Sequence, residues 1–190
     1  MKRLFLFLTT CLSFFVSFAQ TDNSLARVEK YNNKLVFFYN EPINDYEQAF
    51  TFENKIENLN CLPPTEIFAA TIKNANLEAA NQSKLYDAII VNSAGRDMAI
   101  VFKDKSKDNA IARVKRTEGK FVFIQCEPVS NYTMIGKYNV SGVGQQLILG
   151  TCPSYQEKIS KLIKKANKEN TDFDGVILGS EKFEQSIKFK

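Results

Sequence analysis

Two acidic patterns recur in the sequence and are the first candidates for chemistry. In one, a Glu-Pro pair precedes a tyrosine by a few residues; in the other, an aspartate opens an apolar run. The set comprises Glu41, Tyr46, Asp87, Glu127, Tyr132 and Asp174. Matched carboxylates and tyrosines suit contact with a ligand, and carboxylate oxygens suit a divalent cation. A structural role is the expected one, because proline ends strands, tyrosine packs across turns, and aspartate accepts backbone N–H groups.

The residue types that most catalytic sites need are missing. The chain contains no histidine, which excludes Ser-His-Asp and Cys-His catalysis, histidine metal sites and the usual pH switch near neutrality. It also lacks a P-loop, a dinucleotide-binding fingerprint, a CxxC pair and a carboxylate-rich metal loop. A hydrolase that uses carboxylates alone has no motif behind it. The sequence therefore predicts a non-enzymatic protein without a cofactor.

The first residues have the form of a cleavable signal peptide. Two basic residues precede an apolar run over residues 4–19, and Ser17 and Ala19 give the small-x-small pattern that signal peptidase reads. The run is shorter than the roughly 20 residues that span a bilayer. We expect cleavage before Gln20 and a mature chain in the periplasm or outside the cell. Without residues 1–19, the 25 basic residues fall to 23 against 21 acidic ones, so bulk charge predicts no nucleic-acid partner.

Three cysteines follow the signal peptide, and an oxidising compartment favours disulfides between them. We favour a bond between Cys126 and Cys152, whose expected strands end at one edge of a sheet, and this leaves Cys61 free or buried. A bond between Cys61 and Cys152, which occupy equivalent positions ahead of the two expected helices, is the alternative.

Nearly all of the mature chain reads as two copies of one unit. Residues 25–46 align without a gap with residues 111–132, at an offset of 86, and residues 86–103 align with residues 173–190 at an offset of 87. A looser match joins the segments that begin at Cys61 and at Cys152. Three matches in the same order indicate an internal duplication. We predict a signal peptide over 1–19, copy one over 20–103, a polar linker over 104–109 and copy two over 110–190.

Each copy has the pattern of an α+β module of the type ββ(β)αββ. In copy one, strand-like residues 25–30 and 35–39 flank a turn, a Glu-Pro pair interrupts the sheet, and Phe50 and Phe52 alternate in a further strand. In copy two the further strand is expected at residues 145–150. An apolar central strand and a closing strand follow the helix. We predict mostly antiparallel sheets with one helix each, and two copies packed about a pseudo-two-fold axis.

The two expected helices differ in their surfaces. The second has Ser154 and Glu157 at capping-box spacing, and its apolar stripe consists of Ile159, Leu162, Ile163 and Ala166. Its other face is basic, with Lys158, Lys161, Lys164, Lys165 and Lys168. The equivalent positions in the first helix are Ile67, Ala70, Lys73, Asn74 and Leu77. The first helix is therefore expected to bury more of its circumference, against the other copy or a partner.

A helix followed by a short "DAII" or "DGVI" strand resembles the small secreted or envelope α/β proteins of bacteria, of which the heavy-metal-binding-like (YbjQ-type) family is the nearest. The resemblance covers about a quarter of each copy. It implies an α/β fold and carries over no metal-binding residue.

These observations favour an exported binding protein that recognises a protein or an envelope component. A basic amphipathic helix is suited to anionic lipid or lipopolysaccharide, although such a face is usually just solvated. The alternative is a small-ligand or divalent-metal-binding protein that uses the groove between the copies, with oxygen ligands such as Glu41, Glu127, Asp87 and Asp174. The identity of the partner and the oligomeric state stay open.

Overall fold

The computed structural model describes residues 22–54, 62, 64–91, 96–139, 153–169, 172–179 and 184–190. The predicted signal peptide and the strand expected at residues 145–150 lie outside these ranges. The helices are α1 (Pro64–Gln82) and α3 (Tyr155–Glu169). The strands are β1 (Leu25–Val28), β2 (Lys30–Tyr31), β3 (Lys34–Phe38), β4 (Glu41–Pro42), β5 (Tyr46–Phe52), β6 (Ala88–Val91), β7 (Asp97–Phe102), β8 (Ile111–Arg113), β9 (Arg116–Thr117), β10 (Lys120–Ile124), β11 (Cys126–Pro128), β12 (Tyr132–Tyr138), β13 (Gly175–Leu178) and β14 (Glu184–Phe189).

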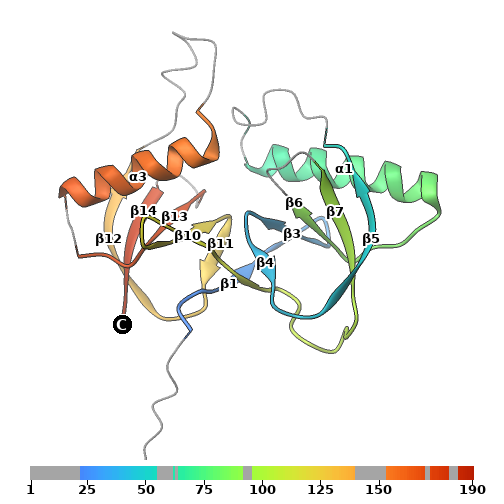
Figure 1. The fold of residues 1–190 in the computed structure, drawn as a ribbon, viewed down its shortest axis with the longest axis horizontal. Coiled ribbons are helices and arrows are strands. Elements are labelled where there is room, and N and C mark those ends of the chain that lie inside the picture. Colours follow the sequence, from blue (N-terminus) through green and yellow to red (C-terminus); the bar gives the residue numbers. More distant parts are fainter. Residues whose placement is uncertain are drawn as a thin grey trace, which may run out of the picture.

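The strands form three sheets. The first-half sheet has the order β2-β3-β6-β7-β5, the second-half sheet β12-β14-β13-β10-β9, and the central sheet β11-β1-β8-β4. Pairing is antiparallel except between β3 and β6 and between β10 and β13. Each helix covers its own five-stranded sheet, and the central sheet lies between the halves on the side away from the helices (Figure 1). The prediction of a mixed α+β fold with mostly antiparallel sheets and two helices is confirmed.

Two apolar layers fill the space on either side of the five-stranded sheets. Side chains from alternate positions of β3 go to opposite layers: Val36 and Phe38 join the helices, whereas Leu35 and Phe37 face the central sheet. This is why the run "KLVFF" is apolar at consecutive positions. Each layer contains residues of both halves, so the halves share a core instead of folding around separate ones.

Tight turns lie in equivalent places of the two halves, and the first confirms the turn predicted between residues 30 and 35. Asn32 and Asn33, between β2 and β3, have φ of 47° and 62°. Glu118 and Gly119, between β9 and β10, have φ of 51° and 77°. Two consecutive residues with positive φ define a type I′ turn, whose twist matches that of the flanking strands.

The expectation of one continuous strand over residues 25–30 is wrong. The strand is interrupted at Glu29, and β1 pairs with β8 and β11 of the other half instead of with a strand of its own half. The Glu-Pro pairs do not interrupt a sheet either. They lie in β4 and β11, the two edge strands of the central sheet, where a proline without an N–H leaves no ladder bond unmade.

The central sheet joins residues that occupy the same place in the two aligned segments. Ala26 pairs with Ala112 across β1 and β8. The N–H of Val28 donates to the Ala110 carbonyl at 2.8 Å, and the N–H of Val114 donates to the Ser24 carbonyl at 2.9 Å. Both bonds therefore join the same two positions of the sequence alignment, with the halves exchanged.

The two helices confirm one prediction and correct another. In α3 the predicted capping box is formed: Glu157 N–H donates to Ser154 Oγ at 3.2 Å, and Ser154 N–H donates to Glu157 Oε2 at 2.7 Å. The predicted apolar stripe of α3 is buried. In α1, Ile67 is buried, but Leu77 is 58 % exposed. The wider apolar surface of α1 is thus only partly covered by the described residues.

Candidate functional site

The two halves present the same edge of their parallel strands to one another. α1 and α3 run outward from the middle of the molecule with their N-terminal ends facing each other (Figure 1). The carboxyl ends of β3 and β6, and of β10 and β13, lie at the helix N-terminal side because each pair is parallel and connected through its helix. In open α/β arrangements ligands bind at the carboxyl ends of strands, so this junction is the first place to search for a site.

Four titratable side chains gather at the junction, and we call Tyr39, Tyr155, Lys158 and Glu184 the junction cluster. The rings of Tyr39 and Tyr155 have centroids 5.7 Å apart, which joins the end of β3 to the start of α3. The Lys158 ammonium lies 4.7 Å from the centroid of the Tyr155 ring. Glu184 accepts a hydrogen bond from the Gly179 N–H at 3.0 Å. The cluster thus draws residues from both halves.

Burial shifts the pKa of every member of the junction cluster in the direction that favours its neutral form. It raises the pKa of Tyr155 to about 12, with smaller contributions from Tyr39 and Glu184. It raises the pKa of Glu184, although the Gly179 N–H and the Lys158 charge oppose the shift. It lowers the pKa of Lys158, which the charge of Glu184 partly restores. Perturbed groups gathered in one place are a mark of functional sites as well as of structural networks.

A polar network that the sequence did not suggest lies beside this cluster. Asp97 is only 3 % exposed, at the start of β7, and accepts a hydrogen bond from Asn54 Nδ2 at 2.8 Å. The same nitrogen lies 2.6 Å from Thr71 Oγ1, and Asn74 Nδ2 donates to Asn54 Oδ1 at 2.9 Å. After burial, the charge of Asp97 is the second cause that raises the pKa of Tyr39. The alignment of residues 86–103 with 173–190 sets Asp97 against Glu184, and this match was the available signal.

A cleft of about 430 Å³, here called the junction cleft, opens at the ends of β10 and β13. It is lined by Glu29, Gln125, Cys126, Glu127, Ile177, Leu178, Gly179 and Gln185. Its volume is within the usual range for small-molecule sites. Glu29 comes from the first half and the other lining residues come from the second. Gln125 has a φ of 53°, and its buried Nε2 has no hydrogen-bond partner among the residues that the structure describes.

The predicted disulfide is not shown. Cys126 is a free thiol, 4 % exposed, and both Cys61 and Cys152 lie outside the described residues. Burial raises the pKa of Cys126 to about 12. Asn40 Nδ2 lies 3.5 Å from the Cys126 sulfur. Asn40 aligns with Cys126 at the offset of 86, so the two partners of this contact are also aligned residues.

The predicted Glu and Tyr pairs are found in two different arrangements. Tyr132 Oη donates to Glu127 Oε2 at 2.9 Å, and the carboxylate adds to the burial that raises the pKa of Tyr132 to about 12. Glu41 instead lies 3.3 Å from the Lys115 ammonium. Tyr46 packs, half-buried, against the apolar layer beneath the central sheet. The aligned positions therefore make different contacts.

Asp87 and Asp174 have the structural role expected of them. Asp87 Oδ2 accepts the Phe102 N–H at 3.1 Å, and Asp174 Oδ2 accepts the Phe189 N–H at 2.9 Å. Asp87 also pairs with Lys105 at 2.9 Å. Each carboxylate thus ties the last strand of its half to the turn before the penultimate strand.

The four carboxylates suggested as oxygen ligands are not brought together. Glu41 and Glu127 lie on the opposite edge strands of the central sheet, and the two aspartates lie in the two different five-stranded sheets. Within the described ranges no three acidic or cysteine side chains form a group that could hold a metal ion.

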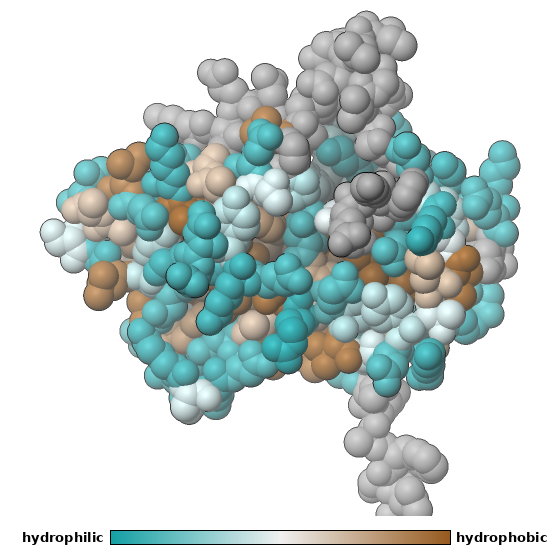
Figure 2. Space-filling view, turned by 180° about the vertical axis from the view of Figure 1, so that it is seen from behind, coloured by the Kyte–Doolittle hydropathy of each residue, from teal (hydrophilic) through white to brown (hydrophobic). Residues whose placement is uncertain are grey.

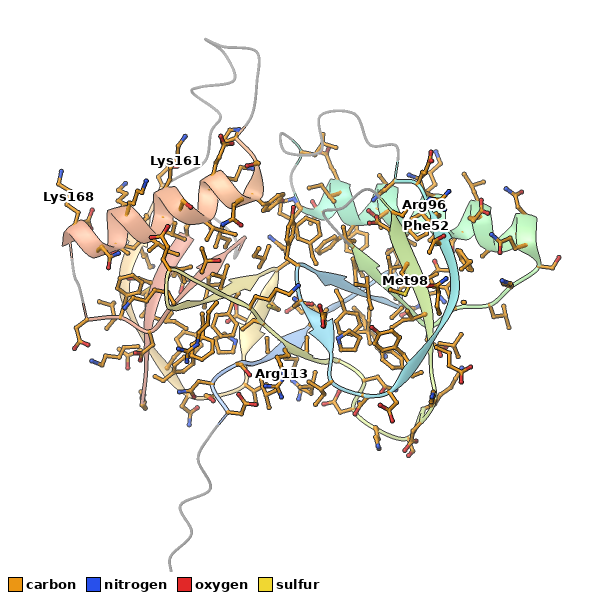
Figure 3. All side chains as sticks on the ribbon, viewed as in Figure 1. Phe52, Arg96, Met98, Arg113, Lys161 and Lys168 are labelled. Atoms are coloured by element: carbon orange, nitrogen blue, oxygen red, sulfur yellow. The ribbon has the colours of Figure 1, made fainter. Side chains whose placement is uncertain are left out.

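The lysines of α3 divide into two kinds. Lys158 is half-buried in the junction cluster. Lys161, Lys164, Lys165 and Lys168 are exposed, and Figure 3 shows Lys161 and Lys168 pointing away from the sheets. Lys165 lies 5.9 Å from the centroid of the Tyr138 ring. We call the four exposed lysines the lysine face of α3.

Among the residues described, no helix is long and apolar enough to cross a membrane. The comparisons with known proteins leave the resemblance noted in the sequence as a prediction: no protein-family model matches the chain, and no curated protein and no solved structure matches it.

Proposed function

We propose that this chain is an exported, non-enzymatic binding protein built from two diverged copies of one module about a pseudo-two-fold axis. The axis would pass between Ala26 and Ala112, which face each other in the central sheet. A symmetric pairing of this kind is how an isologous dimer places a residue opposite its own copy. The export step rests on the signal peptide that the sequence predicts.

Matched ion pairs support the duplication. Arg27 lies 2.8 Å from Asp108, and Arg113 lies 3.1 Å from Asp22. Arg27 and Arg113 are equivalent in the repeat, as are Asp22 and Asp108, both at an offset of 86. Chance convergence of two reciprocal ion pairs on the same repeat positions is improbable, and descent from a symmetric pair of identical modules accounts for both.

The lysine face of α3 is the surface that we assign to the partner. The opposite face of α3 packs in the core through apolar residues, so the lysines are not needed for packing. Lys164 and Lys168 are exposed and make no ion pair with any residue that the structure describes. The first helix carries one lysine, Lys73, at the equivalent positions. The observation that carries the proposal is this asymmetry between the helices, which favours an anionic envelope surface as the partner.

Vesicle binding tests this assignment. The mature chain is mixed with sedimenting vesicles of anionic or of neutral lipid, and the bound fraction is measured. Each lysine near an anionic surface contributes about 1 kcal/mol, so Lys164→Gln with Lys168→Gln should weaken binding to the anionic vesicles roughly 30-fold. Lys73→Gln, at the position equivalent to Lys164, is the matched control and should bind as the unaltered protein does. Equal binding to neutral vesicles would reject an electrostatic surface.

The junction cleft favours a second candidate, a protein that binds a small ligand between its two halves. The specific observation is Gln125 Nε2, a buried donor that has no partner in the described part of the chain. A buried donor without an acceptor costs about 1–3 kcal/mol. A ligand that supplies the acceptor would recover this cost on binding.

A further inference from the structure

Some residues that line the junction cleft have aligned residues on the other side of the central sheet, which we call the counterpart, and one charged position has opposite signs in the two. The repeat sets Glu29 against Lys115 and Glu127 against Glu41. In the counterpart, the Lys115 ammonium lies 3.3 Å from the Glu41 carboxylate. In the cleft, a second carboxylate, that of Glu29, takes the place of the ammonium. In the counterpart, an ammonium group therefore already pairs with the carboxylate that aligns with Glu127.

Both carboxylates of the cleft have capacity left for a cation. Glu29 is exposed and forms no hydrogen bond or ion pair within the described ranges. Among the described residues, Glu127 receives one hydrogen bond, from Tyr132 at 2.9 Å. This bond holds the Glu127 side chain at the mouth of the cleft, because Tyr132 itself packs against the apolar layer beneath the central sheet. Glu29 follows β1 and Glu127 lies in β11, which pairs with β1, and two carboxylates in one cleft repel one another until a positive charge lies between them.

The other residues that line the cleft indicate which chemical groups a ligand should carry beside its positive charge. Gln125 Nε2 is a buried donor without an acceptor among the described residues, and a carbonyl oxygen of the ligand can supply one. The carboxamide rests directly on Gly179, where an added Cβ would fall 1.4 Å from Nε2. Ile177 and Leu178 add apolar surface. The counterpart cannot offer the same donor, since Tyr39 stands at the position of Gln125 and packs on Tyr155 instead.

We propose that the junction cleft binds a ligand in which a primary ammonium group stands next to a carbonyl group, as at the free amino terminus of a peptide or in an amino-acid amide. The ammonium lies between Glu29 and Glu127 in the role that Lys115 has beside Glu41. The carbonyl oxygen accepts from Gln125 Nε2, and an apolar side chain rests on Leu178. A free carboxylate in place of the amide is disfavoured by the two glutamates. This inference rests on the second candidate function and names its ligand class.

Leucinamide is the probe, because it joins an ammonium, a carbonyl and an apolar side chain in one small molecule. It is titrated into the ¹⁵N-labelled mature chain at pH 6.5, where an α-amino group with a pKa of about 8 is protonated. We expect saturable shifts of the Gln125, Leu178 and Gly179 amide signals. N-acetyl-leucinamide, which has lost the ammonium, and leucine, which adds a carboxylate, should each bind at least tenfold more weakly. The peptide Leu-Ala-Ala amide separates the two sources, since tighter binding than that of leucinamide identifies a peptide terminus.

Substitutions of the charged residues test where the ammonium group of the ligand binds. Glu29→Lys restores the pairing of the counterpart within the cleft and should weaken leucinamide binding at least tenfold. Lys115→Glu makes the converse change in the other half and is the matched control, with unchanged affinity. Glu127→Gln keeps the size of the side chain and serves as a second variant if Glu29→Lys does not fold. Saturable binding that N-acetyl-leucinamide shares, or that Glu29→Lys leaves unchanged, would overturn the proposal, as would the absence of saturable shifts.

Two further measurements keep this inference separate from the proposed function. Calcium that produces the same shifts and displaces leucinamide would overturn the ammonium assignment in favour of a metal site. The variant with Lys164→Gln and Lys168→Gln, which tests the lysine face, should bind leucinamide normally. Vesicle binding without any leucinamide binding would therefore refute the cleft and leave the envelope partner standing.

Discussion

Replacing Gly179 by alanine tests the close packing on which the shape of the junction cleft depends. Gly179 has a φ of +91°, and an added Cβ would lie 1.4 Å from Gln125 Nε2 and 2.5 Å from its Cδ. The substitution therefore has two costs, a backbone cost at positive φ and a collision with the Gln125 carboxamide. Because the collision is with the end of a side chain, it is relieved by moving Gln125, and this would change the cleft.

Gly119 separates the two costs. It has a φ of +77° and no atom within 4 Å of an added Cβ, so Gly119→Ala carries the backbone cost alone. That cost is about 1–2 kcal/mol. Gly179→Ala should lose a further 1 kcal/mol or so, the order of an off-rotamer side chain plus displaced packing. At roughly 2–4 °C per kcal/mol for a chain of this size, we expect a melting temperature lower by about 2–8 °C for Gly119→Ala and by several degrees more for Gly179→Ala.

The assay is urea and thermal unfolding of both variants, alone and combined with Gln125→Ala. Removing the Gln125 carboxamide should restore Gly179→Ala to the level of Gly119→Ala, because the collision no longer exists. It should leave Gly119→Ala without improvement, since the two residues lie apart. If Gly179→Ala costs no more than Gly119→Ala, or if Gln125→Ala does not rescue it, the close approach is not a determinant of stability and our account of the cleft wall is wrong.

Three further predictions follow from described contacts. Hydrogen bonds from Ser24 and from Arg27 are the first causes that hold the pKa values of Asp22 and Asp108, respectively, below the usual 3.8. The two carboxylates therefore stabilise the folded state above pH 3.8, and this contribution is lost as the pH falls through their lower pKa values in the folded protein. The Asp22→Asn and Asp108→Asn double variant should then show a shallower fall in melting temperature between pH 4 and pH 2 than the parent. Leu162→Ala should destabilise by about 2–5 kcal/mol in urea unfolding, since Leu162 is fully buried on the inner face of α3, and a loss below 1 kcal/mol would contradict that packing. With Cys11, Cys61 and Cys152 replaced by serine, Cys126 should resist a thiol reagent at pH 8 until the protein unfolds, because its pKa is raised to about 12. Rapid labelling of the folded chain would refute its burial.

Local signals in the sequence predicted local structure well. The capping box of Ser154 and Glu157 and the turns at Asn32 and Glu118 depend only on neighbouring residues. The buried stripe of α3 follows from helical periodicity in the same way. These features are readable because their partners are at most a few positions away.

Local sequence signals could not predict that β1 pairs with strands of the other half. Residues 25–28 look the same whether they extend a local hairpin or pair with β8 and β11, because strand periodicity does not name a partner. The junction cluster escaped for a related reason. Tyr39, Lys158 and Glu184 are ordinary surface residue types, and only the tertiary fold buries them enough to shift their pKa values.

The exchanged strand also has a consequence for the order in which the chain can fold. The hairpins of each half close over a few residues, whereas Ala26 must meet Ala112 and Pro128 to complete the central sheet. Contacts at such sequence separation are slow to form, because a long loop is closed before any pairing offsets its entropy. The central sheet is therefore expected to form last, and the first half has no finished partner until residue 128 is free to fold. A chain arranged in this way acquires its stable form only once both halves are available to pair.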